Sequence, residues 1–268
     1  MTNEIDFEII NETLIDRLFD VFEKDLGNIY SQEFIDKLNE YLKDENITIS
    51  FHKTEKNNVF ANVESNEKNN GYDIYINIPI ETNRSDEQID RDVLRTMIHE
   101  VTHILTNYKI PDFALQKFPN STFNTYRRLT TRNIVNHTYD IRTYKLIDLE
   151  KYLDYVLHIR EKSSFATTVA LSCYFDLAGP KRNPRDLFNS NFQIIKNYLE
   201  NQTSYYTVNN HMSQIDGDAI ELFLMQFAVM ALRKNGKIYK LYQYQLTAFL
   251  KLCIKYWKRL NKLFGERS

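Results

Sequence analysis

Residues 95–107 read RTMIHEVTHILTN and contain a His-Glu-x-x-His pattern at His99, Glu100 and His103. In a helix, side chains four residues apart lie on one face, one turn apart. Both imidazoles can therefore reach a single metal ion about 2 Å from each. The glutamate beside the first histidine then projects toward the same ion, where its carboxylate can accept a proton from water. The pattern predicts a zinc site that carries its own general base.

The surrounding sequence favours a helix over residues 86–108. Ser85 and Gln88 have the spacing of a capping box, in which each side chain bonds the other residue's backbone N–H. Apolar residues recur at helical spacing from Ile89 to Leu105. The competing interpretation is that His99 and His103 are ordinary helix residues that satisfy local hydrogen bonds.

Residues before this helix change to an alternating pattern that is rich in β-branched and aromatic side chains. This pattern predicts strands at 47–53, 58–65 and 72–80, and the polar run 66–71 predicts a hairpin turn. The fold class that follows is α+β, mostly helical, with a small antiparallel or mixed sheet before the His-Glu-x-x-His helix and a helical C-terminal half.

The remaining chain reads as helices separated by short breaks. We expect one compact unit over 1–268, with a catalytic core at 47–160 and a helical subdomain at 161–268. Further helices are predicted at 9–26, 31–43, 127–159, 164–178, 184–200, 217–233 and 237–263.

The segment MIHEVTHIL, with a strand before it, resembles the active-site helix of the zincin metallopeptidases. The resemblance covers about residues 58–145. It implies a zincin-like fold in which His99 and His103 bind Zn²⁺ and Glu100 activates a zinc-bound water that cleaves a peptide bond. It also implies that the strand at 72–80 is an edge strand, along which an extended substrate pairs.

The third zinc ligand is expected from a later helix. Thr106 and Lys109 stand where the metzincin extension has its glycine and third histidine, so a glutamate-type or aspartate-type zincin is the nearer resemblance. No Glu lies between His103 and Glu150.

Two alternatives for this ligand lie in residues 133–147. Asn136-x-x-x-Asp140 is similar to an element of some bacterial metallopeptidase-like proteins, which implies that Asp140 is the ligand. Aligning Asn136-His137 with the Asn-Glu of thermolysin-like enzymes instead implies His137, with Asp140 orienting it. Both alternatives stay open at this point.

His211 is the candidate for stabilising the oxyanion that develops on the substrate. It lies in YYTVNNHMSQIDGD, residues 205–218, which we interpret as a polar loop. A late histidine has this role in thermolysin-like enzymes, and the resemblance implies the same role here.

Composition is typical of a globular protein, with 43% hydrophobic and 26% charged residues. The acidic N-terminus lacks the pattern of a signal peptide, and the two cysteines lack a metal-binding or redox spacing. We therefore expect a cytoplasmic protein with reduced thiols, a peptide or protein as substrate, and no membrane partner.

Charge is distributed unevenly around the net value of −2. Residues 1–50 hold 13 Asp/Glu against 4 Lys/Arg, whereas residues 233–268 hold 10 Lys/Arg against 1 Glu. The basic residues of the second segment alternate with apolar ones at helical spacing. The segment could contact nucleic acid or another anionic partner, but this spacing favours a solvated helix face, and a nucleic acid partner is not our expectation.

Two other functions are compatible with the sequence. One is a zincin-derived binding or regulatory protein that keeps zinc for structure, although the intact Glu100 favours the enzyme. The other is a helical interaction protein without metal. Metal content separates this last hypothesis from the other two.

Overall fold

The computed structural model describes residues 32–107 and 146–265, except for 57–58, 67, 69–70, 82, 84, 158, 175–181, 216 and 236. The chain forms two compact units, residues 1–109 and 110–268, and each is described by itself. The predicted helix at 9–26 lies outside the described residues. The predicted core at 47–160 and subdomain at 161–268 stay predictions.

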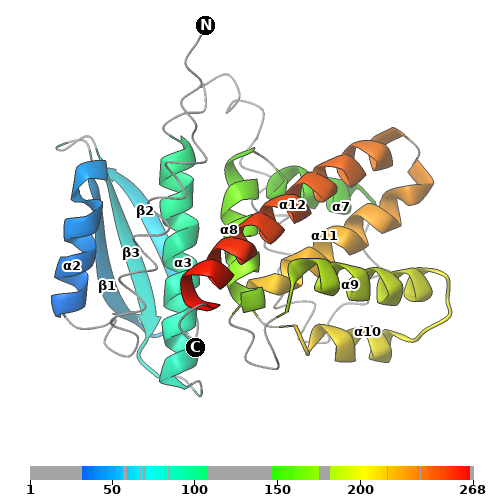
Figure 1. The fold of residues 1–268 in the computed structure, drawn as a ribbon, viewed down its shortest axis with the longest axis horizontal. Helices are drawn as coiled ribbons and strands as arrows, with labels where there is room; N and C mark the ends of the chain where they lie inside the picture. Colours follow the sequence, from blue (N-terminus) through cyan, green and yellow to red (C-terminus); the bar gives the residue numbers. More distant parts are fainter. Residues whose placement is uncertain are drawn as a thin grey trace, which may run out of the picture. The chain divides into compact units, whose positions relative to one another are not determined.

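Among its described residues, the first unit combines the α-helices α2 and α3 with a three-stranded mixed sheet, so the α+β class with a small sheet before the histidine-bearing helix is confirmed (Figure 1). The strand order is β1-β3-β2, in which β1 is parallel and β2 antiparallel to β3. The elements are α2 (Gln32–Leu42), η1 (Lys43–Glu45), β1 (Ile47–Thr54), β2 (Phe60–Asn66), β3 (Gly71–Pro79) and α3 (Asp86–Asn107).

The prediction that residues 72–80 form an edge strand is wrong. These residues belong to β3, which is the central strand and pairs with β1 on one side and β2 on the other. Alternation of side chains shows which residues share a face of a strand, but it does not show which strands lie beside it. The predicted hairpin is confirmed, because β2 and β3 are antiparallel with Asn66 opposite Gly71.

The sheet has one apolar and one polar face. Strand register places Ile49 beside Ile74, and both side chains are buried. Helix α2 contacts β1, and α3 contacts β2 and β3; their buried side chains supply the other half of this core. The opposite face is mostly polar, with residues Thr48, Ser50, His52, Phe60, Asn62, Glu64, Asp73, Tyr75 and Asn77.

The outer edge of β1 is closed by a side chain of α2. The amide of Asn39 accepts a hydrogen bond from the Ile49 N–H at 2.7 Å and donates one to the Ile49 carbonyl oxygen at 3.1 Å. This arrangement imitates a neighbouring strand and occupies backbone groups that an edge strand otherwise leaves unpaired.

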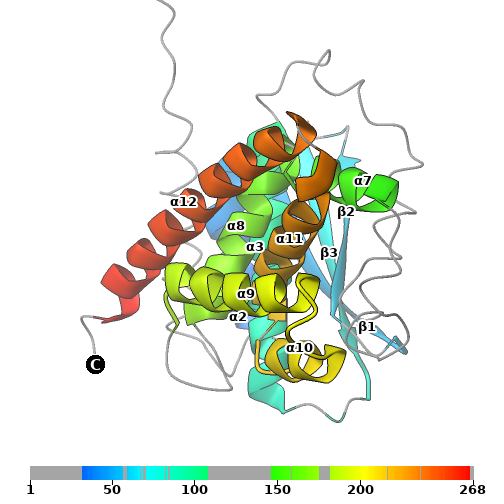
Figure 2. The same ribbon diagram turned by 90° about the vertical axis from the view of Figure 1, so that its right-hand side faces the viewer.

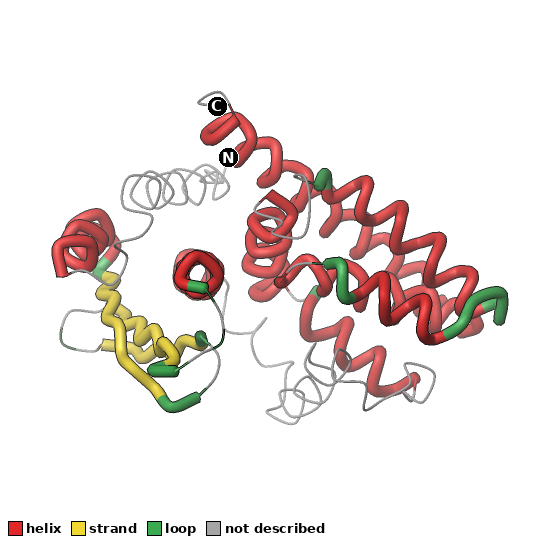
Figure 3. The backbone as a smooth tube through the Cα atoms, turned by 90° about the horizontal axis from the view of Figure 1, so that it is seen from below, coloured by secondary structure: helices red, strands yellow, loops and turns green. Residues whose placement is uncertain are grey.

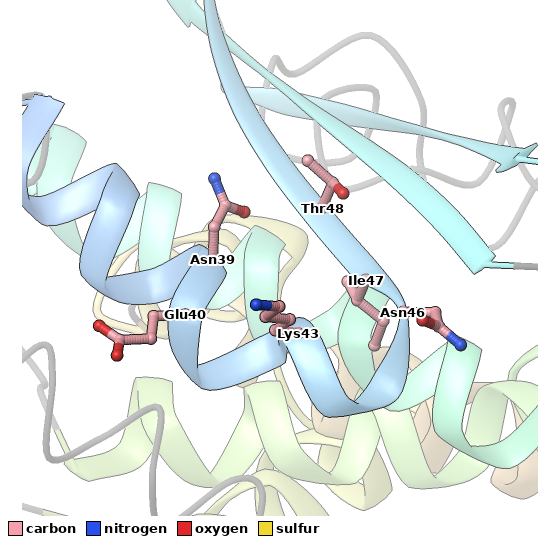
Figure 4. Close-up of a pocket in the computed structure, with 6 residues that line it drawn as sticks. All are labelled: Asn39, Glu40, Lys43, Asn46, Ile47 and Thr48. Carbon is pink, nitrogen blue, oxygen red and sulfur yellow. The ribbon is translucent and has the colours of Figure 1, made fainter. Parts of the chain in front are cut away.

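A shallow hollow lies where α2 leads into β1 (Figure 4). None of the predicted site residues lines it, so it is not the predicted zinc site. Its lining residues are Asn39, Glu40, Lys43, Asn46, Ile47 and Thr48.

The second unit is helical in the part that the structure describes (Figures 2 and 3). None of the helices in the described ranges combines the length and the apolar character needed to cross a membrane. The elements are α7 (Leu146–Val156), α8 (Ile159–Tyr174), α9 (Pro184–Leu199), α10 (Tyr205–Met212), η3 (Gly217–Ala219), α11 (Ile220–Ala231), η4 (Leu232–Asn235) and α12 (Lys237–Gly265).

Local signals account for two helix starts in this unit. Asn183 caps α9 by accepting a hydrogen bond from the Arg185 N–H, and Pro184 occupies the first turn, as predicted. Ser204 caps α10 by accepting from the Thr207 N–H. The interpretation of residues 205–218 as a polar loop is therefore wrong for 205–212. There Val208 and Met212 are buried, and α10 packs on α9.

Two hydrogen bonds, one buried and one part-buried, connect α7 to later helices. The Tyr152 hydroxyl donates to the Glu221 carboxylate at 2.5 Å, and the Tyr242 hydroxyl donates to Asp154 at 2.5 Å. Burial raises the pKa of Glu221 to about 7; the Tyr152 hydrogen bond opposes this shift and the nearby Asp218 adds to it. A carboxyl group in the core of the unit therefore titrates near neutral pH.

We predict that Glu221→Gln stabilises the protein at pH 8. Between about pH 4.5 and 7 the folded form keeps the Glu221 proton while the unfolded form releases it. Stability is therefore lost as pH rises through this window and stays low above it. Glutamine is neutral at every pH and can accept the same hydrogen bond. Urea unfolding should show a gain of about 2–3 kcal/mol at pH 8 that shrinks toward pH 4.5; an equal effect at both pH values would contradict the prediction.

Candidate functional site

Helix α3 begins with the predicted capping box. The Gln88 N–H donates to the Ser85 hydroxyl at 3.3 Å, and the Ser85 N–H donates to the Gln88 side-chain oxygen at 3.1 Å. These bonds fix the residue at which α3 begins. The position of each later residue around the helix follows from this start, and with it the face that packs on the sheet. The buried residues of α3 include Val93, Met97, Val101 and Ile104, which leaves the face of the two histidines only half-buried.

The two histidines of α3 lie in contact with one another. Their Nε2 atoms are 2.9 Å apart, and the ring centroids are 4.6 Å apart at an angle of 77°. Two tetrahedral ligands at about 2.0–2.1 Å from one ion would have nitrogen atoms about 3.3 Å apart. A small opening of the pair therefore suffices for His99 and His103 to bind one metal ion through Nε2. In its absence, one ring can donate a hydrogen bond to the other.

Glu100 is also half-buried, on the turn that carries both histidines. One turn earlier, the Arg95 guanidinium pairs with the Asp92 carboxylate on the same helix. This pairing offsets a positive charge that would otherwise disfavour a cation at the histidines. Inside α3, the Thr102 hydroxyl donates to the Ile98 carbonyl oxygen at 2.7 Å, so this buried polar group uses a backbone acceptor of its own helix.

The two predicted third ligands, His137 and Asp140, lie outside the described residues. A carboxylate that the sequence analysis did not select is Glu161, in the first turn of α8 in the second unit. Together, His99, His103 and Glu161 have the donor groups to hold a metal ion, whose identity the donors leave open. A search for glutamate ligands that continued past Glu150 into the next helix would have included Glu161.

His211 lies in α10 of the second unit, where its Nε2 is 2.8 Å from the Asn191 side-chain oxygen. Its ring centroid is 5.9 Å from that of Phe223. Burial lowers the pKa of His211, and the positive charge of Arg182 lowers it further. The ring is therefore neutral at physiological pH and donates to the fully buried Asn191. The predicted oxyanion role of His211 stays a prediction.

Comparisons of the chain with protein-family models, with curated proteins and with solved structures find no match. The residues of α3 and their donor chemistry are therefore the features of the chain that bear on its function.

Proposed function

We propose that the protein is a zinc-dependent metallohydrolase that cleaves peptide bonds. The observation that carries the proposal is the pair of Nε2 atoms of His99 and His103, 2.9 Å apart, with Glu100 on the same turn. Two imidazoles on one helix face, with a carboxylate beside them, supply two ligands and a base within five residues. A structural zinc site needs only the ligands, so Glu100 favours the enzyme over a binding protein that keeps zinc for structure.

As the third ligand we propose Glu161, ahead of Asp140 and His137. Two imidazoles and one carboxylate are a ligand set that zinc hydrolases use while keeping a position open. His99, His103 and Glu161 offer these groups. Glu161 lies 58 residues after His103, in the second unit. For that reason it is tested separately from the histidine pair below.

Bound Zn²⁺ would supply Lewis-acid polarisation of the substrate carbonyl and lower the pKa of water. The chain's own contribution is the Glu100 carboxylate, which accepts the proton of the attacking water and passes it to the leaving amine. General acid–base catalysis of this kind contributes about 10²–10⁴ to the rate.

For an extended peptide substrate, we propose β2 as the strand that pairs with it. Strand β3 is central, and the Ile49 backbone groups on the outer edge of β1 already bond to Asn39. Within the described residues, no strand pairs with the other edge of β2, and α3 packs directly on β2 and β3. Addition of a peptide strand to such an edge is a common recognition mode.

The first test is zinc stoichiometry by elemental analysis of protein purified without added metal. Because we propose one site, we expect about one zinc per chain in the wild type. His99→Ala and His103→Ala should hold almost none, because each removes one of the ligands. His52→Ala is the matched control, because His52 lies exposed on β1 in the same unit and should leave the zinc content unchanged.

The third ligand is tested with Glu161→Gln, Asp140→Asn and His137→Ala. Of these three variants, only Glu161→Gln should lower the zinc content to the level of His99→Ala and His103→Ala. Loss of zinc in Asp140→Asn or His137→Ala instead would transfer the role to that residue and leave the function proposal standing. Wild-type protein that holds no zinc, even after reconstitution, would overturn the metallohydrolase itself.

A further inference from the structure

Helix α12 carries a concentration of positive charge that the metal site does not explain. Residues 237–265 contain seven Lys/Arg and no Asp/Glu, although the whole chain has 34 Lys/Arg against 36 Asp/Glu. The rest of the chain is therefore net acidic, whereas this one long helix carries only positive charge.

The apolar face of α12 is already used within the second unit. The helix packs on α8, α9 and α11, and Figure 2 shows it crossing α8 and running beside α11. Among its described residues, the main apolar face is therefore buried in the unit, whereas basic amphipathic helices usually bind lipid by inserting such a face into the membrane surface. Its buried residues are Tyr242, Leu246, Phe249, Cys253, Tyr256 and Leu260.

The opposite face forms a straight basic stripe. Its members recur every three or four residues, so they lie on one side of the helix, and all are exposed. Along the helix axis the stripe is about 33 Å long, with neighbours about 4.5–6 Å apart. We define the lysine stripe as Lys240, Tyr244, Thr247, Lys251, Lys255, Lys258 and Lys262.

The chemistry of the lysine stripe fits a flexible polyanion. Like charges one turn apart are unfavourable in a helix, and an anionic chain along the stripe would relieve that repulsion. A single strand of nucleic acid can follow a straight row of cations, because its phosphates are flexibly linked. Tyr244, 74% exposed among these lysines, offers a ring on which an unpaired base can stack; a duplex has no such base to offer.

In place of the solvated helix face expected from the sequence, we propose that the lysine stripe of α12 binds single-stranded nucleic acid. The lysines contact the phosphates, and Tyr244 stacks on a base. The interaction uses the second unit alone and does not involve His99, Glu100 or His103, so it stands or falls independently of the metallohydrolase.

The test is fluorescence anisotropy of the full-length protein with a labelled 20-nucleotide oligothymidylate. Five lysines on a single strand predict a slope of log K against log salt of about −3.5, so affinity should fall about 100-fold between 50 and 200 mM salt. The triple variant Lys251→Gln, Lys255→Gln and Lys258→Gln should reduce the slope by about 2. Tyr244→Ala should weaken binding about fivefold or more without changing the slope.

A triple variant with the same change of charge in the first unit, Lys43→Gln, Lys53→Gln and Lys56→Gln, is the matched control and should bind like the wild type. Circular dichroism and thermal melting confirm that each variant is folded. The proposal is overturned if the oligothymidylate does not bind at 50 mM salt, or if the α12 variant binds as tightly as the control. It is equally overturned if a 20-base-pair duplex, anionic vesicles or polyglutamate bind while the single strand does not.

Discussion

Glu100→Gln should retain about one zinc per chain, the stoichiometry proposed for the His99–His103 site, and lower kcat/KM for peptide hydrolysis by about 10²–10⁴-fold. Glutamine has nearly the size of glutamate, so the turn of α3 between His99 and His103 keeps its shape. It cannot accept a proton, however, so the attacking water loses its base. The measurement is hydrolysis of a library of internally quenched fluorescent peptides, with zinc content determined on the same samples.

His52→Ala, which leaves α3 untouched, should hydrolyse the same peptides at the wild-type rate. If Glu100→Gln lost zinc together with activity, the carboxylate would be acting on the metal site rather than on water. If the wild type held zinc and Glu100→Gln were as active as the wild type, Glu100 would not be the base. If the wild type held zinc but hydrolysed none of the peptides, the result would favour a binding or regulatory protein that keeps zinc for structure.

Gly71→Ala should destabilise the protein by about 3 kcal/mol, because the new methyl group has no room at the start of β3. It would overlap the Asn46 carbonyl oxygen and lie 2.7 Å from the Asn46 Cβ. That carbonyl accepts the Tyr72 N–H at 2.9 Å, which begins the pairing of β1 with β3. Relief of the overlap would break this bond, and urea unfolding measures the cost.

Asn46→Gly is the control for this site. Asn46 has a φ of 53°, a left-handed conformation that glycine adopts without steric cost. The stability of Asn46→Gly should therefore stay close to that of the wild type, while Gly71→Ala unfolds at markedly lower urea. Ordinary surface substitutions change the free energy of unfolding by less than about 0.5 kcal/mol. A loss this small in Gly71→Ala would contradict the prediction, because it would show that β3 moves away from Asn46 without destabilising the protein.

Elements with strong local signals could be predicted from the sequence. The capping box at Ser85 and Gln88 and the Asn183-Pro184 start of α9 each bring together groups within one turn, so the sequence alone contains the whole interaction. Helix α10 was missed because its Thr and Asn residues have weak helical preference. Its Ser204 cap is local, but burial of Val208 and Met212 needs packing on α9.

The proximity of His99 and His103 was predicted and is confirmed, since a spacing of four residues on a helix brings two rings together. Their role as zinc ligands stays a prediction. The third ligand could not be chosen from the sequence, because it must come from residues distant in the chain. Two carboxylates, Asp140 and Glu161, and one histidine, His137, all have donor atoms that bind zinc.

The sequence by itself determined the alternation of the three strands, the start of α3 and the face that carries both histidines, because each depends on neighbours within a few residues. Tertiary structure alone decided that β3 is central, that Asn39 closes the edge of β1, and that the carboxyl group of Glu221 is buried beside Tyr152. These contacts join residues that are 10 to 69 positions apart. They form only where the packing of the whole unit compensates for the entropy of bringing them together.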